Sequence, residues 1–229
     1  MSRVETFRSE AHTSKGRLQR IPIQVRSPEQ RVQDFAEVSL GYSPEMARQE
    51  AARCLQCRHH PCTEGCPVGI NIPGFLEKLS TGDFACALSI IREDNTLPAI
   101  CGRVCPQEIQ CERHCTLGRQ GDPVAIGALE RFVADWERGN RSQSTGQPVG
   151  WVTGNKGNVA VVGSGPAGLT AAAELSRLGY KVTVFEALHT PGGVLRYGIP
   201  EFRLPKPILG DELDAIMQMG VEIRTNVLI

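Results

Sequence analysis

Eight cysteines in the first half of the 229-residue chain fall into two closely spaced groups. The first group has the spacing C-x2-C-x4-C-x3-C-P and consists of Cys54, Cys57, Cys62 and Cys66. The second has the spacing C-x3-C-P-x4-C-x3-C and consists of Cys101, Cys105, Cys111 and Cys115. Thiolates at such spacing hold either a zinc ion or an iron-sulfur cluster, so both groups predict metal binding.

The close spacing within the first group favours iron-sulfur clusters over zinc. A zinc ribbon separates its two cysteine pairs by about 12–20 residues, whereas four residues separate Cys57 from Cys62. A proline after the fourth cysteine, here Pro67 after Cys66, is also found in bacterial ferredoxins, where that cysteine binds the neighbouring cluster. The spacing therefore predicts two 4Fe-4S clusters, with zinc or inert structural thiols as the alternatives.

A glycine motif in the second half of the chain indicates a dinucleotide cofactor. In VAVVGSGPAGL, a G-x-G-x-x-G pattern at Gly163, Gly165 and Gly168 lies between a strand pattern and a helix pattern. These glycines permit a tight turn, a close approach of the backbone to a pyrophosphate, and close helix packing. Pro166 begins the helix, whose amide end faces the phosphates. Glu186 ends the next strand and would bind the ribose of FAD or NAD while repelling the 2′-phosphate of NADP.

Composition and charge exclude several classes of function. The chain has 25 basic and 25 acidic residues, which leaves no electrostatic basis for binding nucleic acid or an anionic membrane. No stretch approaches the roughly 18 apolar residues of a membrane span, and the polar N-terminus carries no export signal. The nine cysteines are therefore expected in the reducing cytoplasm, where thiols serve as ligands or catalysts more often than as disulfides.

The cysteines are expected to lie in a helical domain over residues 31–139, after a flexible arm over 1–30. Ser43 should cap a helix that begins at Pro44 and runs towards Cys54. Two short amphipathic helices are predicted over 72–95, separated at Gly82, and another over 125–139. No strand pattern occurs in this part, so the domain should be all-helical, with Cys86 in a buried apolar role.

After a polar linker over 140–157, residues 158–229 alternate between strand and helix patterns. A buried strand over 158–163 is followed by a helix from Pro166 to about Leu178 and by a strand over 181–186. A helix from about Pro207 to Met219 and a strand over 221–225 come next. This alternation predicts a parallel, Rossmann-like sheet. The expected fold class is therefore α plus α/β, with a helical double-cluster domain followed by an FAD-binding domain.

The cysteine pattern, together with GSGPAGL, PGGVLRYGIPEFRLPK and GALERFVAD, resembles the small, NADPH-oxidising subunit of bacterial and archaeal glutamate synthase. Related modules occur in dihydropyrimidine dehydrogenase and in electron-bifurcating ferredoxin:NADP oxidoreductases. The resemblance covers about residues 20–229. It implies that FAD takes hydride from NADPH and that two 4Fe-4S clusters carry single electrons to a flavin of a larger partner subunit.

The resemblance also implies which residues hold the flavin, and it predicts no catalytic residue in this chain. The residues that would hold or line FAD are Gly163, Gly165, Pro166, Ala167, Gly168, Glu186, Gly192, Gly193, Val194 and Arg203.

The resemblance divides the cluster ligands across the two cysteine groups. Pro67 turns the chain away after Cys66, which predicts that Cys66 serves the second cluster. By resemblance, the first cluster is held by Cys54, Cys57, Cys62 and Cys115. The second is held by Cys66, Cys105 and Cys111, and its fourth ligand is either the nearby thiol of Cys101 or, as favoured by related modules, the carboxylate of Glu130.

The chain stops at Ile229, within the first half of the FAD domain that the resemblance implies, and has no second glycine motif for NADPH. A sheet without its other half is expected to leave one edge and one face uncovered. We therefore expect a truncated chain that keeps its clusters but does not complete hydride transfer, with NADPH bound by a region outside it.

Two classes of function follow from these observations. In the first, the chain is the electron-transfer part of an NAD(P)H-dependent oxidoreductase, with the large glutamate synthase subunit as partner and glutamate synthesis from glutamine and 2-oxoglutarate as outcome. The same module could instead supply electrons to a pyrimidine dehydrogenase or a ferredoxin:NADP oxidoreductase. In the second class, the chain is a non-enzymatic iron-sulfur or zinc module.

Overall fold

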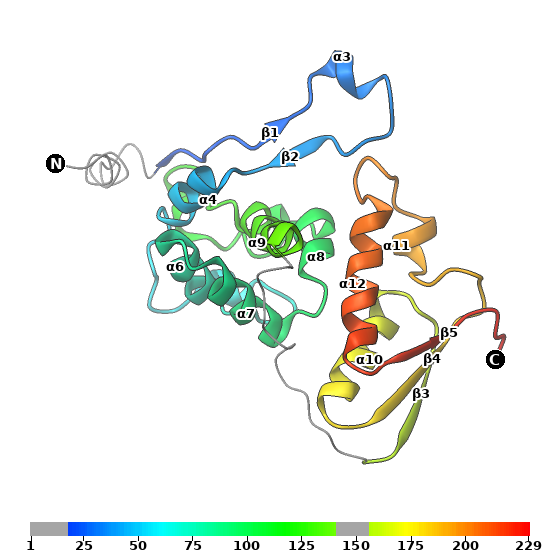
Figure 1. Cartoon of the computed structure of the whole chain (residues 1–229). Helices are drawn as coiled ribbons and strands as arrows, with labels where there is room; N and C mark the ends of the chain where they lie inside the picture. Colours follow the sequence, from blue (N-terminus) through cyan, green and yellow to red (C-terminus); the bar gives the residue numbers. More distant parts are fainter. Residues whose placement is uncertain (1–17, 141–155) are drawn as a thin grey trace. The chain divides into compact units, whose positions relative to one another are not determined.

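The computed structural model describes residues 18–140 and 156–229, which divide into two compact units (Figure 1). Of the described residues, the first unit comprises 18–26 and 39–140, and the second comprises 27–38 and 156–229. Most of the predicted linker over 140–157 lies outside the described residues, as do residues 1–17 of the predicted arm.

The first unit is mainly helical. Its α-helices are α4 (Pro44–Ala51), α5 (Pro61–Glu64), α6 (Ile72–Thr81), α7 (Phe84–Asp94), α8 (Pro98–Val104) and α9 (Ile126–Asn140). Two short 3-10 helices, η1 (Gln107–Ile109) and η2 (Thr116–Arg119), lie between α8 and α9. An antiparallel pair of strands, β1 (Gln24–Val25) and β2 (Ser39–Gly41), also belongs to this unit. The all-helical prediction missed this pair, because strands of two and three residues are too short to show an alternating pattern.

The helix boundaries follow local signals in the sequence. Ser43 caps α4 by accepting a hydrogen bond from Met46 N at 3.3 Å, and Pro44 is its first residue, as predicted. Gly82 ends α6 in the left-handed conformation with φ of +88°, and Asp83 then caps α7. A residue with a side chain would be strained at Gly82, so this position separates the two helices.

Helices α4, α6, α7 and α9 pack together around the core of the first unit. Among its fully buried side chains are Phe75, Leu76, Leu79, Ile91 and Leu129. Burial of each such side chain stabilises the fold by about 1.5–3 kcal/mol. Cys86 lies beside the buried face of α7 and is partly exposed, so the prediction of a buried role for it is wrong.

Residues 18–26, which the sequence analysis assigned to the arm, contact the first unit. The amide of Asp122 donates to Leu18 O at 2.8 Å, and the Tyr42 hydroxyl donates to Ile21 O at 2.6 Å. The Arg20 guanidinium also donates to Glu112 Oε2 at 2.6 Å, so residues 18–26 are held by the first unit and the prediction of a flexible arm is wrong for them.

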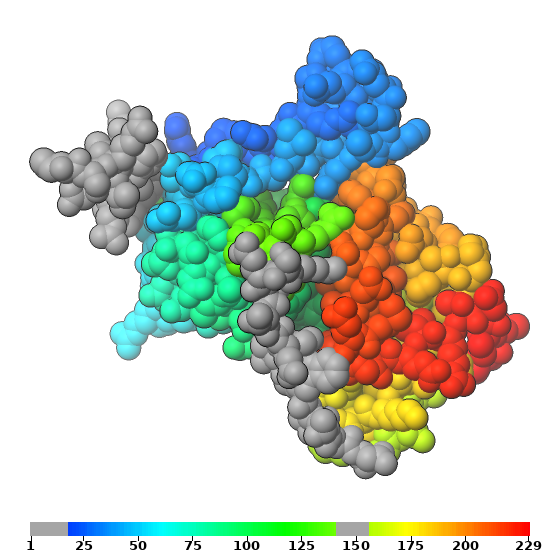
Figure 2. All heavy atoms as spheres, in the orientation of Figure 1, coloured from blue at the N-terminus to red at the C-terminus, as the bar shows by residue number. Residues whose placement is uncertain are grey.

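The segment between β1 and β2 carries exposed apolar side chains. It contains the short helix α3 (Pro28–Arg31), capped by Ser27, and is drawn in blue in Figure 2. Val32 and Phe35 are 85% and 74% exposed.

The second unit contains a parallel three-stranded sheet in the order β3-β4-β5. Its elements are β3 (Asn158–Val162), α10 (Pro166–Arg177), β4 (Lys181–Phe185), α11 (Val194–Tyr197), α12 (Lys206–Gln218) and β5 (Glu222–Arg224). Helices α10 and α12 contact each other, and α10 also packs on β3 and β4, as expected of right-handed crossovers. The parallel sheet with its crossover helices confirms the predicted fold class.

The two faces of the sheet differ in burial. Val182 and Val184 of β4 are buried together with Leu169 and Ile216 of the helices. Val162 of β3 is 67% exposed, so the prediction of a buried β3 is wrong, whereas the expectation of an uncovered face fits this exposure.

Among the described helices, none has the length and apolarity that crossing a membrane requires.

Candidate iron-sulfur and dinucleotide sites

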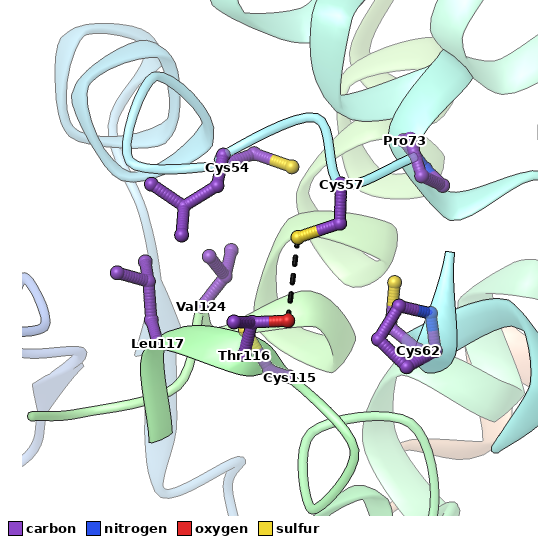
Figure 3. A pocket seen from close by; sticks show the side chains of 10 residues that line it. Cys54, Cys57, Cys62, Pro73, Cys115, Thr116, Leu117 and Val124 are labelled. Carbon is purple, nitrogen blue, oxygen red and sulfur yellow. Dashed lines mark hydrogen bonds between the residues drawn. The ribbon is translucent and has the colours of Figure 1, made fainter. Parts of the chain in front are cut away.

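Four cysteine side chains line one cavity of the first unit (Figure 3). They are Cys54, Cys57, Cys62 and Cys115. The structure thus brings the last cysteine of the second group to the first three cysteines of the first group. The rest of the lining consists of Leu55, Pro61, Pro73, Thr116, Leu117 and Val124.

Local backbone structure aims these cysteines at the cavity. Cys54 lies three residues after Ala51, the last residue of α4, and its amide donates to Ala51 O at 3.1 Å. In the loop that follows, Gln56 and His60 both have left-handed backbone with φ of 50° and 42°. Non-glycine residues pay a steric cost for this conformation, so surrounding contacts must hold it. One such contact is the hydrogen bond from Gln56 Nε2 to Pro73 O at 2.9 Å.

The donors of this cavity suit a cluster better than a single ion. Zinc would need its ligand sulfurs about 2.3 Å from one point. Four thiols instead surround a cavity with otherwise largely apolar walls. This donor set fits a 4Fe-4S cluster, which takes four thiolates at separate iron atoms.

Two thiols of this cavity, those of Cys54 and Cys62, have raised pKa values. Burial raises the pKa of Cys54 and raises that of Cys62 to about 11, and the neighbouring thiols add to both shifts. Because the thiolate is the metal ligand, metal binding must displace these protons. Loading is therefore favoured at higher pH.

A buried ion pair lies next to Cys54. Glu50 is 0% exposed, and its Oε1 accepts from Arg53 Nη1 at 2.5 Å and from Ala125 N at 2.8 Å. The Arg53 guanidinium also donates to Asp122 O at 2.6 Å. The pair thereby fastens the 122–125 segment, which carries the cavity residue Val124, to α4. Sequence reasoning missed Glu50, because its burial leaves no local signal.

The remaining candidate ligands are here called the second ligand set and are Cys66, Cys101, Cys105, Cys111 and Glu130. The Cys101 and Cys105 side chains share a hydrogen bond, which raises the pKa of Cys101 and lowers that of Cys105. Burial raises the pKa of Cys111, and nearby Glu112, Glu130 and Cys66 raise it further. Cys66 therefore lies near Cys111, and none of the described residues that line the cavity of Cys54 belongs to the second ligand set.

Glu130 and Cys101, the two candidates for the fourth ligand of the second ligand set, both contact Asn95. Glu130 on α9 is 6% exposed, and its Oε1 accepts from Asn95 Nδ2 at 2.6 Å. The Cys101 thiol donates to Asn95 Oδ1 at 3.6 Å. Asn95 thus holds the side chains of Glu130 and Cys101 near each other.

The glycine motif forms an open loop between β3 and α10. Gly163 has φ of +92°, and neither it nor Gly165 has any atom within 4 Å of the place a Cβ would take. At Gly168, by contrast, a Cβ would lie 2.0 Å from Gly163 O. Pro166 is the first residue of α10, as predicted. The space beside Gly165 and the helix N-terminus together fit a pyrophosphate.

Glu186 organises this loop. It is 7% exposed; its Oε2 accepts from Ser164 N and Oε1 from Leu188 N, both at 2.9 Å, and the Ser164 hydroxyl also donates to it. These hydrogen bonds lower the pKa of Glu186. Ser164 Oγ in turn accepts from Gly192 N at 2.9 Å. Sequence reasoning missed Ser164, a variable position of the motif.

The other predicted flavin residues follow in the 192–204 segment. A Cβ on Gly193 would lie 2.8 Å from Gly165 Cα, so this segment packs directly on the glycine loop. Val194 begins α11 and is 56% exposed, and Arg203 is also exposed. The Lys206 ammonium holds the segment by donating to three carbonyls, those of Leu195, Ile199 and Leu204, at 2.6–3.2 Å.

Sequence comparisons match both parts of the chain. Residues 31–142 match the family described as dihydropyrimidine dehydrogenase domain II, 4Fe-4S cluster, and residues 161–207 match the NAD(P)-binding Rossmann-like domain. The chain is 42% identical over 192 residues to the NAD-dependent dihydropyrimidine dehydrogenase subunit PreT of Salmonella typhimurium, which covers 83% of this chain and 45% of that subunit. It is 38% identical over 207 residues to the NADPH glutamate synthase small chain of Escherichia coli, covering 90% and 42% of the two chains. The chain is a homologue of both subunits.

This homology confirms the resemblance and the fold class. Residues 31–142 form a 4Fe-4S cluster domain, and a Rossmann-like domain follows it. A third relative, the NADP(+)-dependent formate dehydrogenase subunit beta of Moorella thermoacetica, is 41% identical over 185 residues, covering 72% of this chain and 26% of that one. The chain spans under half the length of these relatives. Its two parts therefore match a 4Fe-4S cluster domain and a Rossmann-like domain.

Proposed function

We propose that the first unit binds two 4Fe-4S clusters and passes electrons between a flavin and a partner subunit. The observation that carries this proposal is the cavity lined by Cys54, Cys57, Cys62 and Cys115. Four thiols from segments so far apart in the sequence are brought together, with apolar walls that would shield a cluster from water. When bound, such clusters take up and release one electron at a time.

The second cluster is assigned to Cys66, Cys105 and Cys111. Cys66 and Glu130 both raise the pKa of Cys111, which supports their presence in one group. Glu130 is favoured over Cys101 as the fourth ligand by the resemblance to related modules, although a thiolate is the more usual ligand of iron in such clusters.

FAD is the proposed cofactor of the second unit. The open space beside Gly165, the N-terminus of α10 and the ordered Glu186 support a pyrophosphate and a ribose at this loop. Hydrogen bonds from Ser164 and Leu188 fix the Glu186 carboxylate beside the glycine loop, where a ribose would follow the pyrophosphate. The electrons would come from NADPH or NADH bound outside this chain.

The partner is proposed to be the large subunit of glutamate synthase, which uses the electrons to make glutamate from glutamine and 2-oxoglutarate. A pyrimidine-reducing partner is the second candidate, because the 4Fe-4S family and the relatives at 42% identity carry the name dihydropyrimidine dehydrogenase. Since all nine cysteines are free thiols in the structure, a reducing, cytoplasmic location is proposed as well.

Anaerobic purification of the full chain tests the proposal. We expect broad absorption around 400 nm and about eight iron atoms per chain. A colourless, zinc-loaded protein would support the non-enzymatic zinc alternative instead. The two partners are distinguished by mixing the dithionite-reduced chain with each partner subunit in turn and measuring the rate at which the clusters are reoxidised.

A further inference from the structure

The wall of the first cavity contains one side-chain hydroxyl, that of Thr116. The Cys57 thiol donates a hydrogen bond to Thr116 Oγ1 with a sulfur-oxygen distance of 3.3 Å, drawn as the dashed line in Figure 3. The two residues are 59 positions apart in the sequence. Thr116 begins η2 directly after Cys115, so the helix that follows one proposed ligand directs a polar group at another.

The direction of this hydrogen bond depends on the proton of the thiol. A hydroxyl can donate as well as accept, and its hydrogen rotates to suit the partner. As a cluster ligand, Cys57 is a thiolate that carries no proton. At this distance the Thr116 hydroxyl must then be the donor and the sulfur the acceptor.

The surroundings make such a hydrogen bond effective. The other side chains that line the cavity, apart from the cysteines, are leucine, proline and valine. In a low-dielectric environment a hydrogen bond is electrostatically stronger than in water. Hydrogen bonds to the sulfurs are one of the factors that set the reduction potential of a cluster, because they stabilise its more negative, reduced form.

We propose that Thr116 is a positioning residue that raises the reduction potential of the first cluster by donating a hydrogen bond to Cys57 Sγ. This inference rests on the proposed function, since it requires a cluster at Cys54, Cys57, Cys62 and Cys115. A cluster with a higher reduction potential accepts electrons more readily, so Thr116 would favour electron transfer to the first cluster.

Thr116→Val tests the proposal, because valine keeps the shape of threonine and removes the donor. The anaerobically purified full chain is titrated electrochemically while the reduced clusters are followed by electron paramagnetic resonance. We expect the reduction equilibrium of one cluster to shift about tenfold towards the oxidised form, which is about 59 mV for a one-electron couple. The other cluster serves as an internal reference and should not move.

Two further variants complete the comparison. Thr116→Ser keeps the hydroxyl and should restore the potential of the wild type. Thr81→Val removes a hydroxyl of the same unit that donates to a backbone carbonyl, Lys78 O, at 2.8 Å and not to a sulfur. This variant should leave both reduction potentials unchanged.

Each outcome has a defined meaning. Unchanged potentials of both clusters in Thr116→Val would overturn the inference while leaving the proposed function intact. Loss of iron in Thr116→Val would also overturn it, because Thr116 would then serve to build the ligand set and not to tune it. Absence of clusters from the wild type would instead contradict the proposed function, and iron analysis of that sample decides this before any variant is compared.

Discussion

At the scale of single residues, the sites depend on buried polar groups whose partners lie far away in the sequence. Ser164 and Leu188 both donate backbone hydrogen bonds to Glu186, and the Ser164 hydroxyl accepts from Gly192 N. A buried donor without an acceptor costs about 1–3 kcal/mol. Glu186 thus shapes the glycine loop itself, in addition to its predicted role at a ribose.

Glu186→Ala should destabilise the second unit by about 1–3 kcal/mol, because Ser164 N and Leu188 N lose their acceptor. In a protein that retains flavin, FAD should also be lost on dialysis, while the iron content stays the same. Urea unfolding and flavin absorbance measure these effects. Glu222→Ala is the control: Glu222 pairs with Arg224 at 2.8 Å, but both side chains are about half exposed, so the free energy of unfolding should hardly change. Equal stability of the two variants would contradict the role given to Glu186.

The same carboxylate predicts a loss of stability in acid. Hydrogen bonds lower the pKa of folded Glu186 below its ordinary value of 4.5. A depressed pKa in the folded state stabilises the protein above the ordinary pKa, and this contribution is lost as the pH falls through the folded value. The free energy of unfolding should therefore decline below about pH 4.5, and less steeply in Glu186→Gln. Parallel pH profiles of wild type and variant would argue against this source.

At the scale of elements, α4 and the 122–125 segment are joined by the buried Glu50–Arg53 pair, whose side chains are 0% and 4% exposed. Removing one partner of a buried pair leaves the other charge without compensation, which typically costs about 3–5 kcal/mol. The segment that this pair holds carries Val124, a residue of the first cavity. The shape of the cavity should therefore depend on the Glu50–Arg53 pair, although neither residue is a proposed cluster ligand.

Glu50→Ala should reduce both the stability of the first unit and its iron content. Thermal unfolding and iron analysis after anaerobic gel filtration measure the two effects. Glu137→Ala provides a matched control, since Glu137 pairs with Arg92 at 2.5 Å between α7 and α9 but both side chains are 20–30% exposed. This control should cost no more than about 1 kcal/mol and keep its iron. Full iron retention by Glu50→Ala would show that the pair does not support the cavity.

The loops between the helices predict a crossed assignment of the cysteines. Cys66 lies near Cys111, and it is not among the described residues that line the first cavity. Cys66→Ser should therefore alter the spectrum of the same cluster as Cys105→Ser, while Cys54→Ser and Cys115→Ser should alter the other. Paramagnetic resonance of the reduced variants distinguishes the two patterns. If Cys66→Ser and Cys54→Ser disturb one and the same cluster, the crossed assignment is wrong.

At the scale of the whole molecule, the two sites belong to different compact units. All proposed cluster ligands lie between Cys54 and Glu130 in the first unit, and the glycine motif lies in the second. Residues 1–140 alone should therefore hold as much iron per chain as the full sequence. Dithionite should reduce this piece as it reduces the full sequence, whereas NADPH should reduce neither, because the proposed NADPH site lies outside both. Absorbance around 400 nm measures both, and a piece without iron would show that cluster binding needs the second unit.

Most helix and strand boundaries could be predicted from the sequence, because they depend on local patterns of residues. The capped start of α4, the break at Gly82, the alternation of strands and helices, and the G-x-G-x-x-G turn each depend on residues within a few positions of one another. The short β1–β2 pair escaped prediction and β3 was wrongly predicted to be buried, since neither feature depends on a local period. The cysteine spacing by itself determined that the chain carries metal-binding thiols.

Tertiary structure decided which of these thiols share a cavity. Nothing in the local spacing places Cys115 beside Cys57 or makes Thr116 its hydrogen-bond partner, and the resemblance supplied the grouping without the contact. The burial of Glu50 and Ser164 likewise depends on segments that meet only when the chain folds. Sequence patterns report the periodicity and chemistry of neighbouring residues, whereas the partners of a buried polar group are chosen by packing between distant segments, where each unpaired group carries its own energetic cost.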